Sequence, residues 1–196
     1  MTLVLDEHPL LALKLISCVF PDGLAGSEAS SLHRYLDPIV PAPVRAPEGT
    51  KTQIRDLLRV GGFKPSGRSK PASEYLIKAA EGGFLGPINT AVDVCNVVSL
   101  HSGIPISVVD LDRVQGDLSV RIAAPETRYV FNASGQEIDV SGLLCLHDSQ
   151  GACANAVKDS SARKQTSSRP AVCTCSGGPE SSKSPWMRPL TGRVRC

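Results

Sequence analysis

The hydrophobic pattern changes at Pro105, and this change limits the possible folds more than any other feature of the sequence. Before Pro105, three stretches repeat apolar residues every three or four positions and are closed by a glycine, which is typical of short amphipathic helices: residues 51–60, 72–81 and 89–101. After Pro105 come short runs of β-type sequence separated by turns: 106–111, 117–123, 127–131, 143–148 and 151–157. Helices followed by strands predict an α+β fold, with helices on a mostly antiparallel, layered β-rich sheet.

The first 44 residues are expected to form an N-terminal segment of the same domain as the core at residues 45–164. Residues 9–20 are apolar and fit either a strand or a helix, and Ser27 can cap a short helix that runs to Leu36. Residues 38–49 contain too many prolines to form a helix. A chain of 196 residues with 41% hydrophobic content can bury one sizeable core but has little room for two.

Several function classes receive no support from composition. No run of about 18 apolar residues occurs, so we expect no membrane segment. The apolar stretch 10–20 contains Lys14 and is followed by no cleavage pattern, which favours an unexported, cytoplasmic protein. The seven irregularly spaced cysteines argue for reduced thiols. The four histidines have no metal-ligand spacing and Cys173 and Cys175 lack a second pair, so neither a metal nor a cofactor is expected.

Charge is distributed unevenly along the chain. Residues 1–159 hold 14 Lys/Arg against 18 Asp/Glu, a net of −4, and residues 160–196 hold 7 against 1, a net of +6. The globular part is therefore acidic and DNA binding is not expected, so any RNA-binding argument must rest on a local patch. The best candidate patch places cations at helical spacing and in the loop that follows: Lys51, Arg55, Arg59, Lys64 and Arg68. This basic ridge is either a solvated helix face or a surface that contacts RNA phosphates.

The helix expected at residues 89–101 carries Asn89, Asp93 and Asn96 on one face of an otherwise apolar segment. Buried polar groups need defined hydrogen-bond partners. One interpretation is a structural network that ties this helix to the turn containing Asp110 and Asp112. The other places these side chains at the rim of a ligand pocket. Asp110 and Asp112 would share one face of a strand, or cap backbone N–H groups of a turn.

The segment from Ile88 to Ala123 resembles the B3/B4 domain of the phenylalanyl-tRNA synthetase beta subunit. The family pattern I-N-x-x-V-D-x-x-N is present here from Ile88 to Asn96, and G-x-P followed by D-L-D is present from Gly103 to Asp112. The upstream sequence KPASEYLIKAAEGG is similar to a helix of short proteins that consist of this domain alone. The resemblance covers about residues 45–160. It implies a β-rich α+β fold and tRNA or aminoacyl-tRNA as partner.

In bacterial synthetases this domain hydrolyses tyrosine mischarged on phenylalanine tRNA, and the resemblance leaves three functions open here. The first is tRNA binding without catalysis. The second is a free-standing aminoacyl-tRNA deacylase whose pocket is lined by Asn89, Asp93, Asn96, Ser107, Asp110 and Asp112. The third is a protein-interaction remnant. Ser107 occupies the position where the synthetases carry a histidine of the editing pocket, so editing cannot be transferred at that position. The sequence does not predict the oligomeric state.

Residues 165–196 match neither the strand nor the helix that the family has at its C-terminal end. Translating the codons in an alternative frame converts Val172–Gly177 into a strand-like sequence and Glu180–Arg188 into an amphipathic helix. Our hypothesis is that this segment is out of frame. The hypothesis predicts that residues 165–196 form a disordered tail, so that the sheet lacks its terminal strand and the domain lacks its final helix. Resequencing of the locus tests the hypothesis.

Overall fold

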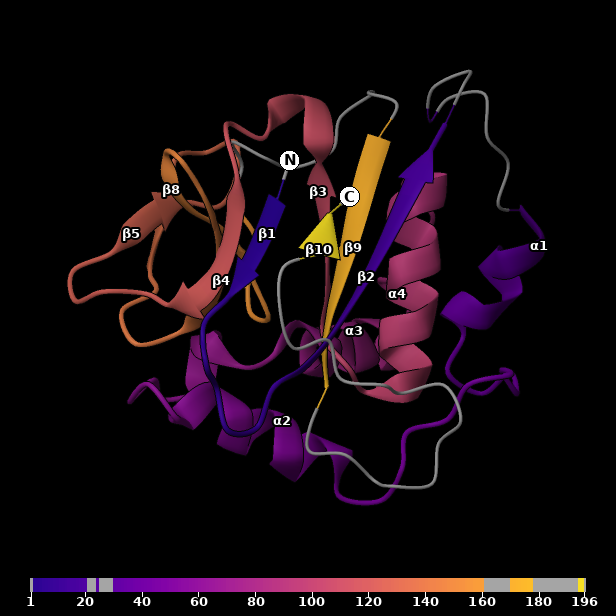
Figure 1. Ribbon diagram of the computed structural model, residues 1–196. Coiled ribbons are helices and arrows are strands. Elements are labelled where there is room, and N and C mark those ends of the chain that lie inside the picture. The colour runs from indigo at the N-terminus through magenta and orange to yellow at the C-terminus, as the bar shows by residue number, and fades with distance from the viewer. Residues whose placement is uncertain (1, 21–23, 25–29, 161–169, 178–193, 196) are drawn as a thin grey trace.

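The computed structural model describes residues 2–20, 24, 30–160, 170–177 and 194–195 (Figure 1). Its four α-helices are α1 Ser30–His33, α2 Thr50–Arg59, α3 Ala72–Glu81 and α4 Thr90–Ser102. Short 3₁₀ helices whose bounds lie within the described residues accompany them: η2 Arg34–Leu36, η3 Gly67–Ser69 and η4 Leu111–Arg113. Among these described residues, no helix is long and apolar enough to cross a membrane.

The strands form three sheets. A five-stranded sheet has the order β10-β1-β4-β7-β8, a three-stranded sheet has the order β2-β9-β3, and β5 pairs with β6. All pairs are antiparallel except β1 with β4. The strands are β1 Thr2–Leu5, β2 Ala12–Val19, β3 Ile106–Asp110, β4 Leu118–Ile122, β5 Arg128–Val130, β6 Glu137–Asp139, β7 Leu144–Asp148, β8 Gly151–Asn155, β9 Pro170–Gly177 and β10 Val194–Arg195.

The predicted α+β class is confirmed, and so are the three central helices and the five strand runs after Pro105. α4 ends at Gly103, which has a φ of 70° and so adopts the left-handed conformation that glycine accommodates. Residues 9–20, which fitted either a strand or a helix, contain strand β2. Strand β1, which precedes β2 in the sequence, was not predicted. Of the helix expected from Ser27, α1 and η2 are present, and residues 25–29 lie outside the described residues.

Strand β9 corrects the expectation that residues 165–196 contain no strand and that the sheet lacks its terminal strand. Pro170–Gly177 lies between β2 and β3 and pairs with both in antiparallel register. A central strand is held by backbone hydrogen bonds to two neighbours, so its sequence need not be strongly apolar. The position between β2 and β3 is therefore occupied by a strand in the present reading frame. The expected loss of the helix falls on residues 178–193, which lie outside the described part of the chain, and the frame hypothesis stays a prediction.

The hydrophobic core lies between α2 and the two larger sheets. α2 contributes Ile54, Leu57 and Leu58, each 1% exposed, and β-strand residues of both sheets complete the cluster. The turn after α2 packs tightly on the turn before β7, where a Cβ placed on Gly61 would lie 2.2 Å from the Gly142 carbonyl oxygen. Figure 1 shows α4 alongside the three-stranded sheet, with α2 and α3 at the foot of the molecule. This arrangement brings α2 and α3 together as the scaffold for a charged surface.

Candidate functional site

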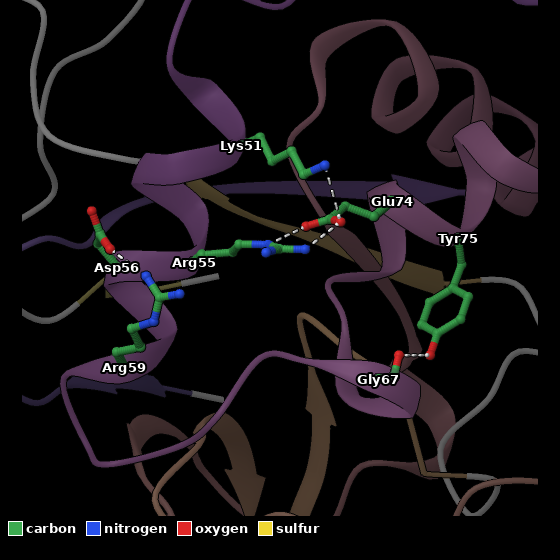
Figure 2. A network of polar contacts seen from close by, with 7 residues as sticks. All are labelled: Lys51, Arg55, Asp56, Arg59, Gly67, Glu74 and Tyr75. Carbon is green, nitrogen blue, oxygen red and sulfur yellow. Dashed lines mark hydrogen bonds and ion pairs between the residues drawn. The ribbon is translucent and has the colours of Figure 1, made fainter.

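Two of the three cations of α2 contact a carboxylate that the sequence did not reveal. Arg55 donates two hydrogen bonds to Glu74 of α3, at 2.7 and 2.8 Å, and Lys51 Nζ lies 3.6 Å from the same carboxylate (Figure 2). Because Glu74 is 19 positions from Arg55, helical spacing could not indicate the pair. Asp56 is the only acid within residues 51–70, so the local sequence indicates no other carboxylate near these cations. The structure adds Glu74, and Arg55 is largely committed to an internal bidentate ion pair with it.

This ion pair changes the electrostatics of both partners. Burial by itself raises the pKa of Glu74, but the hydrogen bonds and charge of Arg55, with Lys51, outweigh it and hold the pKa below its ordinary value. The hydrogen bond to Glu74 correspondingly raises the pKa of Arg55 above its ordinary value. Both side chains are largely shielded from solvent, with 26% of Arg55 and 13% of Glu74 exposed. The pair therefore links α2 to α3 across 19 positions of sequence.

The other three cations of the predicted ridge lie in different surroundings. Arg59 donates to Asp56 on its own helix at 2.6 Å, and both side chains are about half exposed. Lys64 and Arg68 are exposed beyond the end of α2, and Arg68 belongs to η3. The five predicted cations thus do not form one continuous ridge. Two of them, Lys51 and Arg68, line a groove of about 540 Å³ between α2, η3 and α3.

The polar residues of α4 serve mainly to start the helix. The Asn89 side chain caps it by accepting a hydrogen bond from the Val92 N–H at 3.0 Å. Asp93 is 1% exposed and accepts from the Ile88 N–H at 2.8 Å, and its other oxygen lies 3.1 Å from His33 Nε2 of α1. Asp93 therefore has internal partners, as the structural interpretation required. They are Ile88 and His33, however, and not the turn with Asp110 and Asp112.

Asn96 differs from the other two residues of this polar face. It is half-buried and makes no side-chain hydrogen bond within the described part of the chain. Its side chain is therefore the one of the three that remains available to a ligand.

Strand β3 separates Ser107 from the two aspartates. Side chains alternate between the faces of a strand, so Ser107 and Asp110, three positions apart, lie on opposite faces. β3 ends at Asp110, which is fully buried and caps η4 by accepting from the Asp112 N–H at 3.0 Å, whereas Asp112 is exposed. The expectation that the two aspartates share a strand face is wrong, because the chain turns into η4 at Leu111. The capping role is confirmed.

Ser107 belongs to a buried polar cluster that sequence reasoning missed. Its hydroxyl lies 3.0 Å from the Asn155 carbonyl oxygen and 2.8 Å from Asp159 Oδ1, and the same Asp159 oxygen accepts from the Asn155 N–H at 3.0 Å. The Asn155 side chain also contacts the Tyr129 hydroxyl, which donates to the Lys158 carbonyl. Burial, with the negative charge of Asp159, raises the pKa of Tyr129. These residues come from separate strands and loops with no local motif to connect them.

A cavity of about 40 Å³ lies between the sheets, and Ser107 and Asn155 form part of its polar lining. Of the six residues predicted to line one pocket, only Ser107 borders this cavity. Cys145 also lines it, but burial, with Cys153 nearby, raises the pKa of the Cys145 thiol, so it stays protonated and a poor nucleophile. Such a space holds a few water molecules and is too small for an aromatic side chain.

No histidine is hydrogen-bonded to the Ser107 hydroxyl in the described residues, and the carboxylate beside it belongs to Asp159. A serine nucleophile needs an adjacent base, most often a histidine. The hydrogen bonds of the four histidines lie elsewhere: His8 Nδ1 accepts from the Leu10 N–H, His33 contacts Asp93, His101 contacts the Tyr35 carbonyl, and His147 contacts the Cys145 carbonyl. Burial and the charge of Arg121 lower the pKa of His147. Within the described ranges, no three His, Cys, Asp or Glu side chains gather where they could hold a metal ion.

Comparison with known proteins agrees with this architecture. The sequence model of the B3/4 domain family matches residues 64–168, which is more than half of the chain. The chain belongs to the B3/4 domain family. It is also 30% identical over 112 residues to the "Phenylalanine--tRNA ligase beta subunit" of Nitrobacter winogradskyi, an alignment that covers 54% of this chain and 14% of that protein. The resemblance found in the residues from Ile88 to Asp112 is thus confirmed, while this chain corresponds to a small part of that relative.

Proposed function

We propose that this B3/4 domain binds tRNA or aminoacyl-tRNA in the cytoplasm and does not hydrolyse the aminoacyl bond. The observation that carries the proposal is the family match, together with a relative that is named as a subunit of a tRNA ligase. A cytoplasmic location is supported by the described cysteines Cys18, Cys95, Cys145 and Cys153, all of which are free thiols.

Two features of the buried polar cluster favour binding over hydrolysis. The Ser107 hydroxyl has internal acceptors on both Asn155 and Asp159, so a reacting group would have to displace them. The adjoining cavity of about 40 Å³ has no room for a tyrosine side chain. A serine in this setting stabilises the contact between β3 and β8 instead of activating water.

Incubation with a panel of correctly and wrongly charged tRNAs tests both halves of the proposal. We expect saturable tRNA binding that weakens as salt is raised, with deacylation no faster than the spontaneous rate. Absence of tRNA binding at low salt would overturn the binding function and favour the interaction-remnant alternative. Deacylation above the spontaneous rate that disappears in a folded Ser107→Ala variant would establish a hydrolase instead.

A further inference from the structure

Positive charge is concentrated in one segment of an otherwise acidic body. Residues 51–78 hold seven of the 14 Lys/Arg of residues 1–159 and two of the 18 Asp/Glu, a net of +5. The rest of that body therefore holds seven cations against 16 acids, a net of −9. Such a segregated charge attracts polyanions to one face even though the body as a whole repels them.

The fold gathers much of this charge in the groove between α2, η3 and α3, which we term the α2–α3 groove. Its volume is about 540 Å³, within the range of ordinary ligand sites. Four cations line it, one from α2, two from the η3 region and one from α3: Lys51, Arg68, Lys70 and Lys78. Lys70 follows Arg68 in the loop that continues the predicted ridge, whereas Lys78 of α3 was not predicted and lines the groove through tertiary structure.

The acids of the groove are too few to neutralise these cations. Glu74 is already bound by Arg55 through two hydrogen bonds, and Lys51 lies further away, at 3.6 Å. Arg68, Lys70 and Lys78 have no ion-pair partner in the part of the chain that the structure describes. Apart from Glu74, only Glu81 contributes a carboxylate to the described lining. The groove therefore presents unpaired positive charge on residues from α2, the η3 region and α3.

An aromatic ring also lines the groove. Tyr75 of α3 is 37% exposed, and its hydroxyl donates to the Gly67 carbonyl oxygen of η3 at 3.2 Å (Figure 2). This hydrogen bond holds the ring between α3 and the η3 region while leaving part of it open to solvent. Cations combined with an accessible aromatic ring are typical of sites for single-stranded nucleic acid, where phosphates meet the cations and an unstacked base lies on the ring.

We infer that the α2–α3 groove binds single-stranded RNA, with Lys51, Arg68, Lys70 and Lys78 on the phosphates and Tyr75 stacked on a base. The ligand class rests on the proposed function, and the site itself rests on the groove. Phosphate contacts of this kind carry affinity without sequence specificity, so the groove accepts many sequences. It shares no lining residue with the cavity beside the buried polar cluster.

The test measures fluorescence anisotropy of a labelled 12-nucleotide single-stranded RNA and, separately, of unfractionated tRNA. Lys70→Glu and Lys78→Glu should each weaken binding of the 12-mer fivefold or more at low salt. Each should also reduce the slope of log affinity against log salt by about 0.7 to 1. Arg121→Glu is the matched control, because Arg121 is exposed on β4 outside the groove. This substitution changes the net charge by the same amount as Lys70→Glu or Lys78→Glu. Circular dichroism and the thermal midpoint confirm that each variant is folded.

Two substitutions at Tyr75 separate stacking from the structural hydrogen bond. Tyr75→Ala should weaken binding of the 12-mer roughly fivefold or more, because the stacking surface is lost, and Tyr75→Phe should stay within about twofold because the ring remains. Equal losses in the two variants would overturn the stacking role.

The outcomes for the two RNAs separate the inference from the proposed function. A parent protein that binds the 12-mer but not tRNA supports the groove and overturns tRNA binding. Binding of tRNA that is as strong in Lys70→Glu and Lys78→Glu as in Arg121→Glu overturns the groove and leaves tRNA binding intact. Binding of neither RNA overturns both.

Discussion

Replacing Asp93 by alanine tests whether this buried carboxylate stabilises the start of α4. Its side chain is 1% exposed, and its oxygens accept from the Ile88 N–H at 2.8 Å and contact His33 Nε2 at 3.1 Å. We expect Asp93→Ala to lower the free energy of unfolding, because both partners lose their acceptor and α4 loses a negative charge from its first turn.

The size of the effect follows from these contacts. A hydrogen bond to a charged group contributes about 1.5 to 3 kcal/mol, and an anion near a helix N-terminus about 0.3 to 1 kcal/mol. The His33 contact adds little, since 36% of the His33 side chain is exposed. Ile88 is 68% exposed, so water can partly replace the lost acceptor, and removing the carboxylate also relieves its burial. The expected cost is therefore about 2 kcal/mol.

Urea denaturation at neutral pH, followed by circular dichroism, measures this cost. The matched control is Asn96→Ala on the same helix, which should stay within about 0.5 kcal/mol of the parent because Asn96 makes no side-chain hydrogen bond in the described residues. Asp93→Asn should fall between the two, since an amide oxygen still accepts from the Ile88 N–H. If Asp93→Ala unfolds at the same urea concentration as the parent with the same m-value, the stabilising role is refuted.

Two further predictions concern the scaffold. The pKa of Glu74 is lowered in the folded state, so its stabilising contribution is present above the unfolded carboxyl pKa and is lost as pH falls through the folded value. The stability difference between the parent and Glu74→Gln should therefore be largest near pH 7 and shrink in acid, and a pH-independent difference in denaturation midpoints would contradict this reasoning. Gly61→Ala should cost about 3 kcal/mol or more in thermal unfolding, since its Cβ would lie 2.2 Å from a backbone oxygen of Gly142. A neighbouring Gly62→Ala meets no atom within 4 Å, though its φ of 87° adds backbone strain, so it should cost less.

The local elements could be predicted because they depend on nearby residues. The spacing of Ile54, Leu57 and Leu58 predicts α2, and the burial of all three confirms which face meets the core. Gly103 predicts the end of α4, because glycine has no Cβ and adopts the left-handed φ of a helix end without steric cost. The sequence also contained the family motif from Ile88 to Asp112, and with it the α+β class.

The candidate sites depended on contacts between distant residues. Ser107 appeared to belong with Asp110 and Asp112, but alternation along β3 and the turn into η4 separate them, and Asn155 and Asp159 take their place. Likewise, Arg55 was predicted to contact RNA, whereas in the structure it is hydrogen-bonded to Glu74 of α3.

The sequence by itself therefore determined the helices, most of the strands and the overall class of this protein, because periodicity and turn residues act over a few positions. Only the tertiary structure decided which charges are paired, which polar groups share a cavity and which cations line the α2–α3 groove. The physical reason is that ion pairs and hydrogen bonds form over about 3 Å, while the residues that make them are separated in the sequence by up to dozens of positions. Their meeting depends on how α2, α3 and the sheets pack around the common core, and no local pattern encodes that packing.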